Sequence, residues 1–144
     1  VEVLTAQLDL GDRVAEKGKA FGLHTPRGDK VAVTRKLLAV LGPYGRFRDR
    51  MVVDHCIPET IGDVLRAGYW AGITVSPAKS SATDVLNILK AFPDFQDRIM
   101  INTDSGGRFF EDLFALGEDE RIEAALRQKI LFDNAAGFFD LQAA

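Results

Sequence analysis

The sequence predicts an α/β fold built on a parallel β-sheet. Short apolar runs alternate with amphipathic segments at a spacing of roughly 20–30 residues, and such βα repetition implies right-handed crossovers between parallel strands. The runs at 51–53 and 71–75 are largely apolar on both faces, as strands buried in a parallel sheet should be. No linker, low-complexity tract or close repeat interrupts the pattern. Residues 1–144 are therefore expected to form a single domain.

The expected strands are the apolar runs at residues 20–25, 51–55, 70–75 and 99–103. The expected helices place apolar side chains at helical spacing over residues 5–17, 31–41, 58–67, about 81–92, 118–131 and 134–140. Gly18, Gly42-Pro43 and Gly68 follow the first three helices as stop signals. Pro58 lies in the first turn of the third helix, where proline is favoured.

The later elements have equally clear boundaries. Ser81 or Thr83 is expected to cap the fourth helix, and Pro93 ends it. The acidic run at 118–120, followed by Arg121, resembles a helix N-terminus, where acids are favoured by the helix dipole. Trp70 and Tyr69 are expected to pack between helix and sheet. Five phenylalanines are expected to lie on helix faces that pack against the sheet: Phe109, Phe110, Phe114, Phe138 and Phe139.

Composition restricts the range of functions. Hydrophobic residues make up 47% and charged residues 27% of the chain, which is typical of a soluble globular domain. A net charge of −3 and a pI near 5.4 exclude broad, non-specific binding of DNA through a basic surface. They do not exclude a nuclease, because a metal ion can neutralise phosphate charge locally.

Compartment and completeness follow from other simple observations. The single cysteine forbids an intrachain disulfide, so a reducing, cytoplasmic location is expected. No apolar stretch approaches the roughly 18 residues that a membrane span needs, and residues 1–4 do not resemble a signal peptide. Because the sequence begins without Met and with a helix, it is expected to be a truncated or processed piece that lacks upstream βα units.

Three of the expected strands end in a side chain that can bind a metal. The two histidines of the chain, His24 and His55, close the first two runs, and Asp104 follows the fourth. Sites in parallel α/β proteins are built at the carboxyl ends of strands. Imidazole and carboxylate together suit Zn²⁺, Mn²⁺ or Fe²⁺ better than Mg²⁺. The alternative is that the histidines are hydrogen-bonded core residues and that Asp104 is a helix cap.

Four ordered motifs resemble the TatD-type metal-dependent hydrolases: the segments 7–26, 54–73, 102–105 and 134–139. The resemblance implies a (β/α)8 TIM barrel of the amidohydrolase type, with about four strands, five to eight, present here as a C-terminal half-barrel. It implies two divalent ions, Zn, Mn or Mg. His24 and His55 would bind the second ion. Asp104 would bind the first ion and act as the catalytic residue that orients or deprotonates the attacking water.

The chain departs from the TatD pattern at several positions. It lacks the His-x-His pair of the first barrel strand and the Glu of a middle strand, so one copy cannot form a complete two-metal site. Gly106-Gly107 stands where TatD members usually have Pro, and Asn102 stands where many have an acidic residue. A half-barrel would also leave two strand edges unpaired. A small doubly wound domain is the alternative architecture for four parallel strands.

Several neighbours of these residues are secondary candidates. Cys56 is expected to be structural, and Asp54 either to form a hydrogen bond to a ligand residue or to face a helix. The loop residues Arg27, Asp29 and Lys30 either contact an anionic substrate or are simply solvated. The segment 105–108 is a weak candidate for phosphate binding.

The sequence thus predicts a metal-dependent hydrolase of the TatD-like class, in which a metal-bound hydroxide attacks a phosphodiester bond in DNA or a small phosphoester. Two alternatives stay open: a non-catalytic half-barrel that needs a partner chain, and a relative that hydrolyses small amides. In each case the missing N-terminal half, or a partner chain, is expected to be required.

Overall fold

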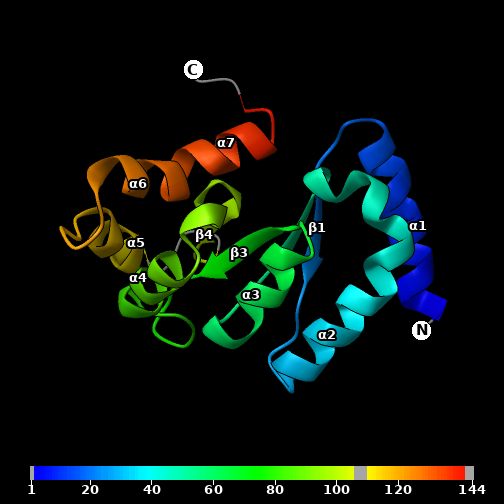
Figure 1. The fold of residues 1–144 in the computed structure, drawn as a ribbon, viewed down its shortest axis with the longest axis horizontal. Coiled ribbons are helices and arrows are strands. Elements are labelled where there is room, and N and C mark those ends of the chain that lie inside the picture. The colour runs from blue at the N-terminus through cyan, green and yellow to red at the C-terminus, as the bar shows by residue number, and fades with distance from the viewer. Residues whose placement is uncertain (1, 106–109, 142–144) are drawn as a thin grey trace.

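A computed structural model describes residues 2–105 and 110–141 (Figure 1). Four parallel strands form one sheet: β1 (Phe21–His24), β2 (Met51–Asp54), β3 (Trp70–Thr74) and β4 (Ile99–Asn102). The α-helices are α1 (Glu2–Glu16), α2 (Lys30–Leu41), α3 (Pro58–Arg66), α4 (Ala82–Ala91), α5 (Phe110–Gly117), α6 (Ala124–Gln128) and α7 (Asn134–Phe138). Short 3₁₀ segments cover Gly42–Arg50 and Pro93–Arg98, and a π-helical turn covers Lys129–Asp133.

The strand order is β1-β2-β3-β4, the same as the order in the sequence. Each βα unit therefore adds a strand on the same side of the previous one, and right-handed crossovers place α2, α3 and α4 on one face of the sheet. A doubly wound sheet reverses its order at a switch point and carries helices on both faces of the sheet. The sequential order is that of a (β/α) barrel, and four strands make about half of one.

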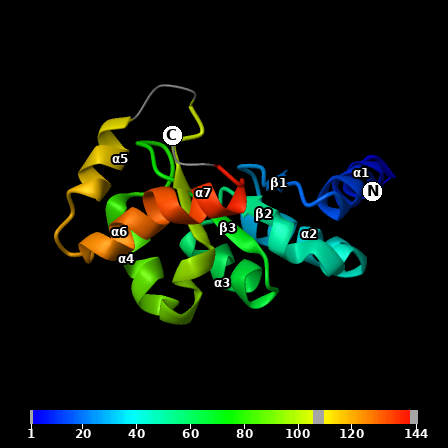
Figure 2. The ribbon, with the colours of Figure 1, turned by 90° about the horizontal axis from the view of Figure 1, so that it is seen from above.

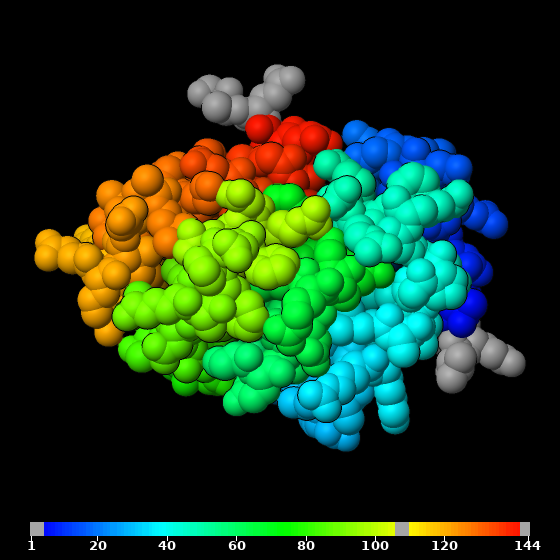
Figure 3. Space-filling model, in the orientation of Figure 1, coloured from blue at the N-terminus to red at the C-terminus, as the bar shows by residue number. Residues whose placement is uncertain are grey.

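The outer face of the sheet supports the helices. Side chains that alternate along the strands point to this face and are buried against α2, α3 and α4: Met51, Val53, Ala71, Ile73, Ile99 and Ile101. Burial of each large aliphatic side chain contributes about 1.5–3 kcal/mol. In the space-filling view the residues of α2 and α3 lie side by side on the face turned to the viewer (Figure 3).

The opposite face corresponds to the inside of a barrel. At its lower end Val52 and Met100 form a separate buried cluster with Phe138 of α7, and Trp70 packs against it. Helix α7 lies across this face (Figure 2). The upper positions of the same face are polar, with His24, Asp54, Thr74 and Asn102 at the strand ends. The carboxyl end of the inner face is therefore the part of the sheet where polar side chains gather.

The structure corrects the expected C-terminal region. Residues 118–123 form turns instead of the start of a helix, and the helix begins at Ala124. The backbone carbonyl of Asp119 accepts a hydrogen bond from Arg127 Nη1, and the Asp119 carboxylate binds Arg121. These contacts close a turn where the charge pattern predicted a helical N-terminus. Helix α5, for which the sequence analysis gave no range although it placed Phe110 and Phe114 on a helix face, is held by the fully buried Leu116.

The aromatic residues differ in whether they are buried as the sequence predicted. Tyr69 is buried and Phe138 is 1% exposed, as expected of packed residues. The prediction was wrong for three phenylalanines, because Phe110, Phe114 and Phe139 are 46%, 69% and 49% exposed. Phe109 lies outside the described residues. No helix in the described part of the chain is long and apolar enough to cross a membrane.

Candidate metal centre

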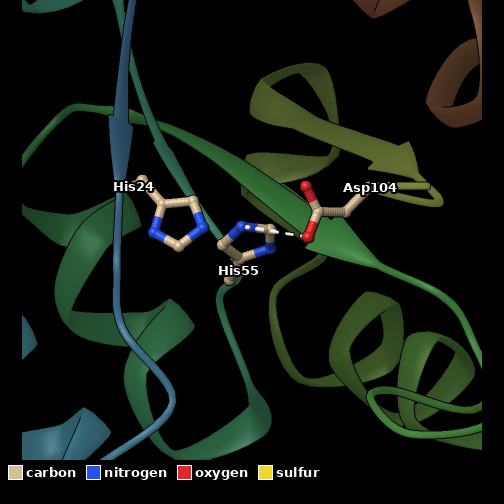
Figure 4. A group of neighbouring side chains, drawn as sticks. All are labelled: His24, His55 and Asp104. Atoms are coloured by element: carbon tan, nitrogen blue, oxygen red, sulfur yellow. Dashed lines mark ion pairs between the residues drawn. The ribbon is translucent and has the colours of Figure 1, made fainter. Parts of the chain in front are cut away.

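The three ligand candidates meet at the carboxyl end of the sheet (Figure 4). His24 is the last residue of β1, His55 directly follows β2, and Asp104 follows β4 by two residues. One donor atom from each of them lies within 4.8 Å of the other two. The imidazole rings of His24 and His55 are 4.2 Å apart between centroids, and His55 Nε2 is 3.6 Å from Asp104 Oδ2. Residues 80 positions apart in sequence thus form one compact group.

Two of the three candidates have unusual backbone angles. His55 has φ 61° and Asp104 has φ 54°, which places both in the left-handed region that residues other than glycine rarely adopt. The amide N–H of His55 donates to Asp54 Oδ1 at 2.7 Å, a bond that helps to hold this conformation. Strained backbone of this kind gathers at functional sites, where the surrounding structure enforces it.

One ring nitrogen of His55 forms no hydrogen bond to any described residue. His55 is 4% exposed, and its Nδ1 lies 2.6 Å from Thr74 Oγ1. Its Nε2 is buried and has no hydrogen-bond partner in the described part of the chain. Burial lowers the pKa of His55 and so favours the neutral form, which is the form that binds metals. A divalent cation coordinated by Nε2 would satisfy this atom, so the residues present fit a metal ion.

A lysine that the sequence analysis did not single out completes the group. Lys79 Nζ donates to Asp104 Oδ2 at 2.7 Å, and this hydrogen bond is the main reason that the pKa of Asp104 is lowered. The carboxylate thus already attracts one cation. Lys79 lies in the loop after β3. This position could have identified it from the sequence, because the loops that follow parallel strands all lie at the functional edge of the sheet.

Lys30 is a structural residue. Its ammonium group donates to Thr25 O at 3.3 Å, to Thr25 Oγ1 at 3.2 Å and to His55 O at 2.9 Å. All three of its N–H groups are therefore used, and Lys30 ties the loop after β1 to the backbone of His55. Burial lowers its pKa. Of the two interpretations left open for this loop, a substrate contact does not apply to Lys30.

A cavity of about 360 Å³ opens above the three ligand candidates, and it is also lined by Arg27, Lys30 and Lys79. Arg27 has no hydrogen bond or ion pair within the described residues, so its guanidinium is available to an anion. Asp29 is exposed and does not line the cavity. The protein is acidic overall, but the rim of this cavity carries positive charge.

Cys56 and Asp54 behave as the sequence predicted. Cys56 is 2% exposed, and its thiol donates to Val53 O. Burial raises the pKa of Cys56 to about 12, so the thiolate that a metal would bind is not formed near neutral pH. Asp54 accepts hydrogen bonds from the backbone of His55 and from Asn102 Nδ2. It therefore helps to hold the ligand candidate His55 in place. Of the weak phosphate-binding candidate 105–108, residues 106–108 lie outside the described residues.

A parallel sheet of this order has the architecture of half a (β/α) barrel, and two imidazoles and a carboxylate gathered at its strand ends make a possible metal site. A more specific likeness comes from the TatD-like protein of Archaeoglobus fulgidus, known from its crystal structure. Its chain is 29% identical to this one with a TM-score of 0.65, and the match covers 97% of this chain and 54% of that chain. No family model matches the chain, and no curated protein matches it significantly.

The match confirms the resemblance to TatD-type proteins that the sequence motifs predicted. The chain is a partial TatD-like fold, equivalent to about half of a TatD barrel, and it spans about half the length of that relative. The doubly wound alternative is therefore wrong, as the sequential strand order already indicated.

Proposed function

We propose that this chain supplies half of the active site of a TatD-like metal-dependent hydrolase that cleaves phosphodiester bonds, DNA being the macromolecular candidate substrate. The observation that carries the proposal is the group formed by His24, His55 and Asp104, whose donor atoms lie within 4.8 Å of one another. In addition, the buried Nε2 of His55 has no hydrogen-bond partner among the described residues.

Each residue has a role that follows from its chemistry. His24 and His55 would hold a Zn²⁺, Mn²⁺ or Mg²⁺ ion through neutral imidazole nitrogens, and Asp104 would hold an ion or accept the proton of the attacking water. Such an ion, when bound, lowers the pKa of a coordinated water from 15.7 to about 7. Asp104, with its lowered pKa, is ionised and ready for either role.

The positive rim of the cavity favours an anionic substrate. Arg27 and Lys79 line it, and Arg27 is not engaged with any other described residue. Guanidinium and ammonium groups are the usual protein ligands of phosphate oxygens. Because Lys79 binds Asp104 in this structure, we infer that a metal ion at Asp104 would release the ammonium group toward the substrate.

The whole activity needs more than this chain. By resemblance, the remaining ligands are a His-x-His pair and a Glu on strands that this sequence does not contain. Within the described residues, no further strand pairs with the outer edges of β1 and β4. The other half of a barrel, in the same chain or in a partner, would pair with both edges. The free, buried thiol of Cys56 fits a reducing cytoplasmic location.

The test is hydrolysis of bis(p-nitrophenyl) phosphate and of a single-stranded oligonucleotide, in the presence of Mn²⁺ or Zn²⁺, by this chain co-expressed with the part of the Archaeoglobus fulgidus TatD-like protein that it does not cover. We expect Asp104→Asn to lower the rate by about 10²–10⁴-fold, as loss of a proton-transfer group does. Asp94→Asn is the matched control, because Asp94 is an exposed aspartate in the 3₁₀ segment before β4, at the opposite end of that strand from Asp104. A rate that Asp104→Asn leaves unchanged would contradict the proposal.

One observation favours a second candidate, a small-molecule amidohydrolase. The cavity of about 360 Å³ suits a ligand rather than a long nucleic acid. An N-acyl amino acid assayed beside the phosphodiester separates the two. Faster metal-dependent release of the amine than of p-nitrophenol would favour the amidohydrolase.

A further inference from the structure

A line of hydrogen bonds runs across the inner face of the sheet and ends at the imidazole of His55. Asn102 Nδ2 donates to Asp54 Oδ1 at 2.9 Å, and Thr74 Oγ1 donates to Asn102 Oδ1 at 2.9 Å. Thr74 Oγ1 also lies 2.6 Å from His55 Nδ1. The line connects β2, β4 and β3 in turn, and both Thr74 and His55 are buried.

Chemistry fixes the direction of every bond in this line. The Asp54 carboxylate can only accept, so the NH₂ group of Asn102 faces it and the amide oxygen of Asn102 faces Thr74. The hydroxyl group of Thr74 has one hydrogen, which it donates to that oxygen. Thr74 Oγ1 must therefore accept from His55 Nδ1–H, because otherwise two lone pairs would face each other at 2.6 Å. The lone pair of His55 is then on Nε2.

Lys79 is the competing partner of His55 Nδ1. Its Nζ lies 3.2 Å from His55 Nδ1 and 2.7 Å from Asp104 Oδ2. An ammonium group only donates, so it could bond to Nδ1 only in the opposite tautomer, in which Nδ1 carries the lone pair. In the Nδ1–H tautomer Lys79 donates to Asp104 alone, and it is the order of the bonds from Asp54 to Thr74 that favours this tautomer.

The line depends on a glycine in the central strand. A Cβ atom at Gly72 would stand 2.3 Å from Asp54 Oδ1 and 3.3 Å from Asp54 Cα. The first distance would force the Asp54 carboxylate to move, and the second is a tight contact with backbone. The absence of a side chain on β3 at this point is therefore what allows the Asp54 carboxylate to lie over the sheet and reach Asn102.

We propose that Asp54, Asn102 and Thr74 are positioning residues that lock His55 in its Nδ1–H tautomer and so present Nε2 to a metal ion. The role of the tautomer rests on the proposed metal site, whereas the tautomer itself does not. The line also accounts for Asn102, which stands where many TatD-type sequences have an acid. With the carboxylate already supplied by Asp54, position 102 must both donate and accept, which an amide does and a carboxylate does not.

The first readout is the tautomer of His55, measured from the long-range ¹H–¹⁵N correlations of the imidazole in ¹⁵N-histidine-labelled apo protein. The two histidines are told apart with His24→Ala. We expect wild-type His55 to carry its hydrogen on Nδ1. In Asn102→Ala the hydrogen of Thr74 becomes free to point at Nδ1, so we expect a substantial Nε2–H population. A wild-type His55 protonated on Nε2, or an Asn102→Ala spectrum identical to wild type, would overturn the proposal.

The second readout is the affinity for Zn²⁺. We expect Thr74→Val to weaken it by about 10–100-fold, as loss of the partner behind a ligand histidine does. Thr74→Ser, which keeps the hydroxyl group, should restore it, and Thr83→Val on the exposed face of α4 should leave it unchanged. If Thr74→Val does not fold, the comparison is made with Thr74→Ser and Asn102→Ala. The proposal would be overturned if Thr74→Val bound Zn²⁺ as tightly as Thr83→Val does. Where Asn102→Ala replaces Thr74→Val, the same comparison with Thr83→Val applies to it.

The two proposals can fail separately. A wild-type chain that binds no metal but shows the Nδ1–H tautomer contradicts the proposed function and leaves the hydrogen-bonded line supported. A chain that binds metal while His55 carries its hydrogen on Nε2 supports the metal site and contradicts the proposed role of the hydrogen-bonded line.

Discussion

The side chains around the site fall into two groups: those whose role could be predicted from the sequence, and those whose role depends on contacts in the folded chain. His24, His55 and Asp104 could be predicted from the sequence as one group because each ends an apolar run, and strand ends meet at one edge of a parallel sheet. Thr74 and Lys79 could not be predicted in the same way. Their importance comes from contacts to other strands, which no local pattern contains.

Cys56 gives a prediction at this scale. Because its thiol is buried and its pKa is raised to about 12, we expect no measurable reaction with iodoacetamide at pH 8 in the folded protein. After unfolding in guanidinium, one equivalent should react, since the chain has one cysteine. Rapid labelling of the native protein would show that the thiol is exposed or activated, and that Cys56 was wrongly assigned a structural role.

Lys30 gives a second prediction. Lys30→Met keeps the aliphatic stem but removes three hydrogen bonds that join the loop after β1 to His55 O. We expect the free energy of unfolding, measured by urea denaturation, to fall by about 1–3 kcal/mol. Lys36→Met is the matched control because Lys36 is exposed on α2. An equal effect of the two substitutions would contradict the structural role of Lys30.

At the scale of elements, the four strands were predicted within one or two residues because buried parallel strands are short apolar runs with clear stops. The region after β4 was harder. The charged segment 118–131 has a helical pattern, but Arg127 binds backbone carbonyls of the preceding turn and so delays the helix to Ala124. A tertiary contact of this kind overrides the local preference for a helix.

The start of α7 carries the prediction for this scale. Asn134 is buried, and its Nδ2 donates to Gln96 O and to Ile99 O, so it fastens α7 to the beginning of β4. Asn134→Ala leaves two carbonyls without this donor, and we expect a loss of about 1–3 kcal/mol in the free energy of unfolding. Asn134→Asp should be no better, because a carboxylate cannot donate. Asn87→Ala, at an exposed position of α4, is the control. Wild-type stability in Asn134→Ala would refute the anchoring role.

For the whole molecule, the sequence alone left a doubly wound sheet and a half-barrel open, since both are built from the same βα units. The order in which strands join a sheet is set by long-range pairing, and it is visible only in the folded chain. Helix α7 covers the lower part of the inner face, while the polar upper part stays open to the cavity. The half-barrel therefore has a core of its own, whereas the metal site that we propose would take its remaining ligands from the other half of a barrel.

This incompleteness predicts complementation. Co-expression with the part of the Archaeoglobus fulgidus TatD-like protein that this chain does not cover should raise Mn²⁺-dependent phosphodiester hydrolysis above that of either part alone. The reason is that the free edges of β1 and β4 and the missing ligands would be completed together. The gain should disappear with Asp104→Asn. A stable complex whose activity is unaffected by that substitution would favour the non-catalytic interpretation.

The central claim is that His24, His55 and Asp104 form a metal site, and isothermal titration of the apo chain with Zn²⁺ tests it most directly. We expect binding to the wild type, and a loss of affinity in His24→Ala, His55→Ala and Asp104→Ala that exceeds the roughly 10–100-fold effect of removing a partner behind a ligand. Asp94→Ala should bind as the wild type does. Unchanged stoichiometry and affinity in all three ligand variants would contradict the account.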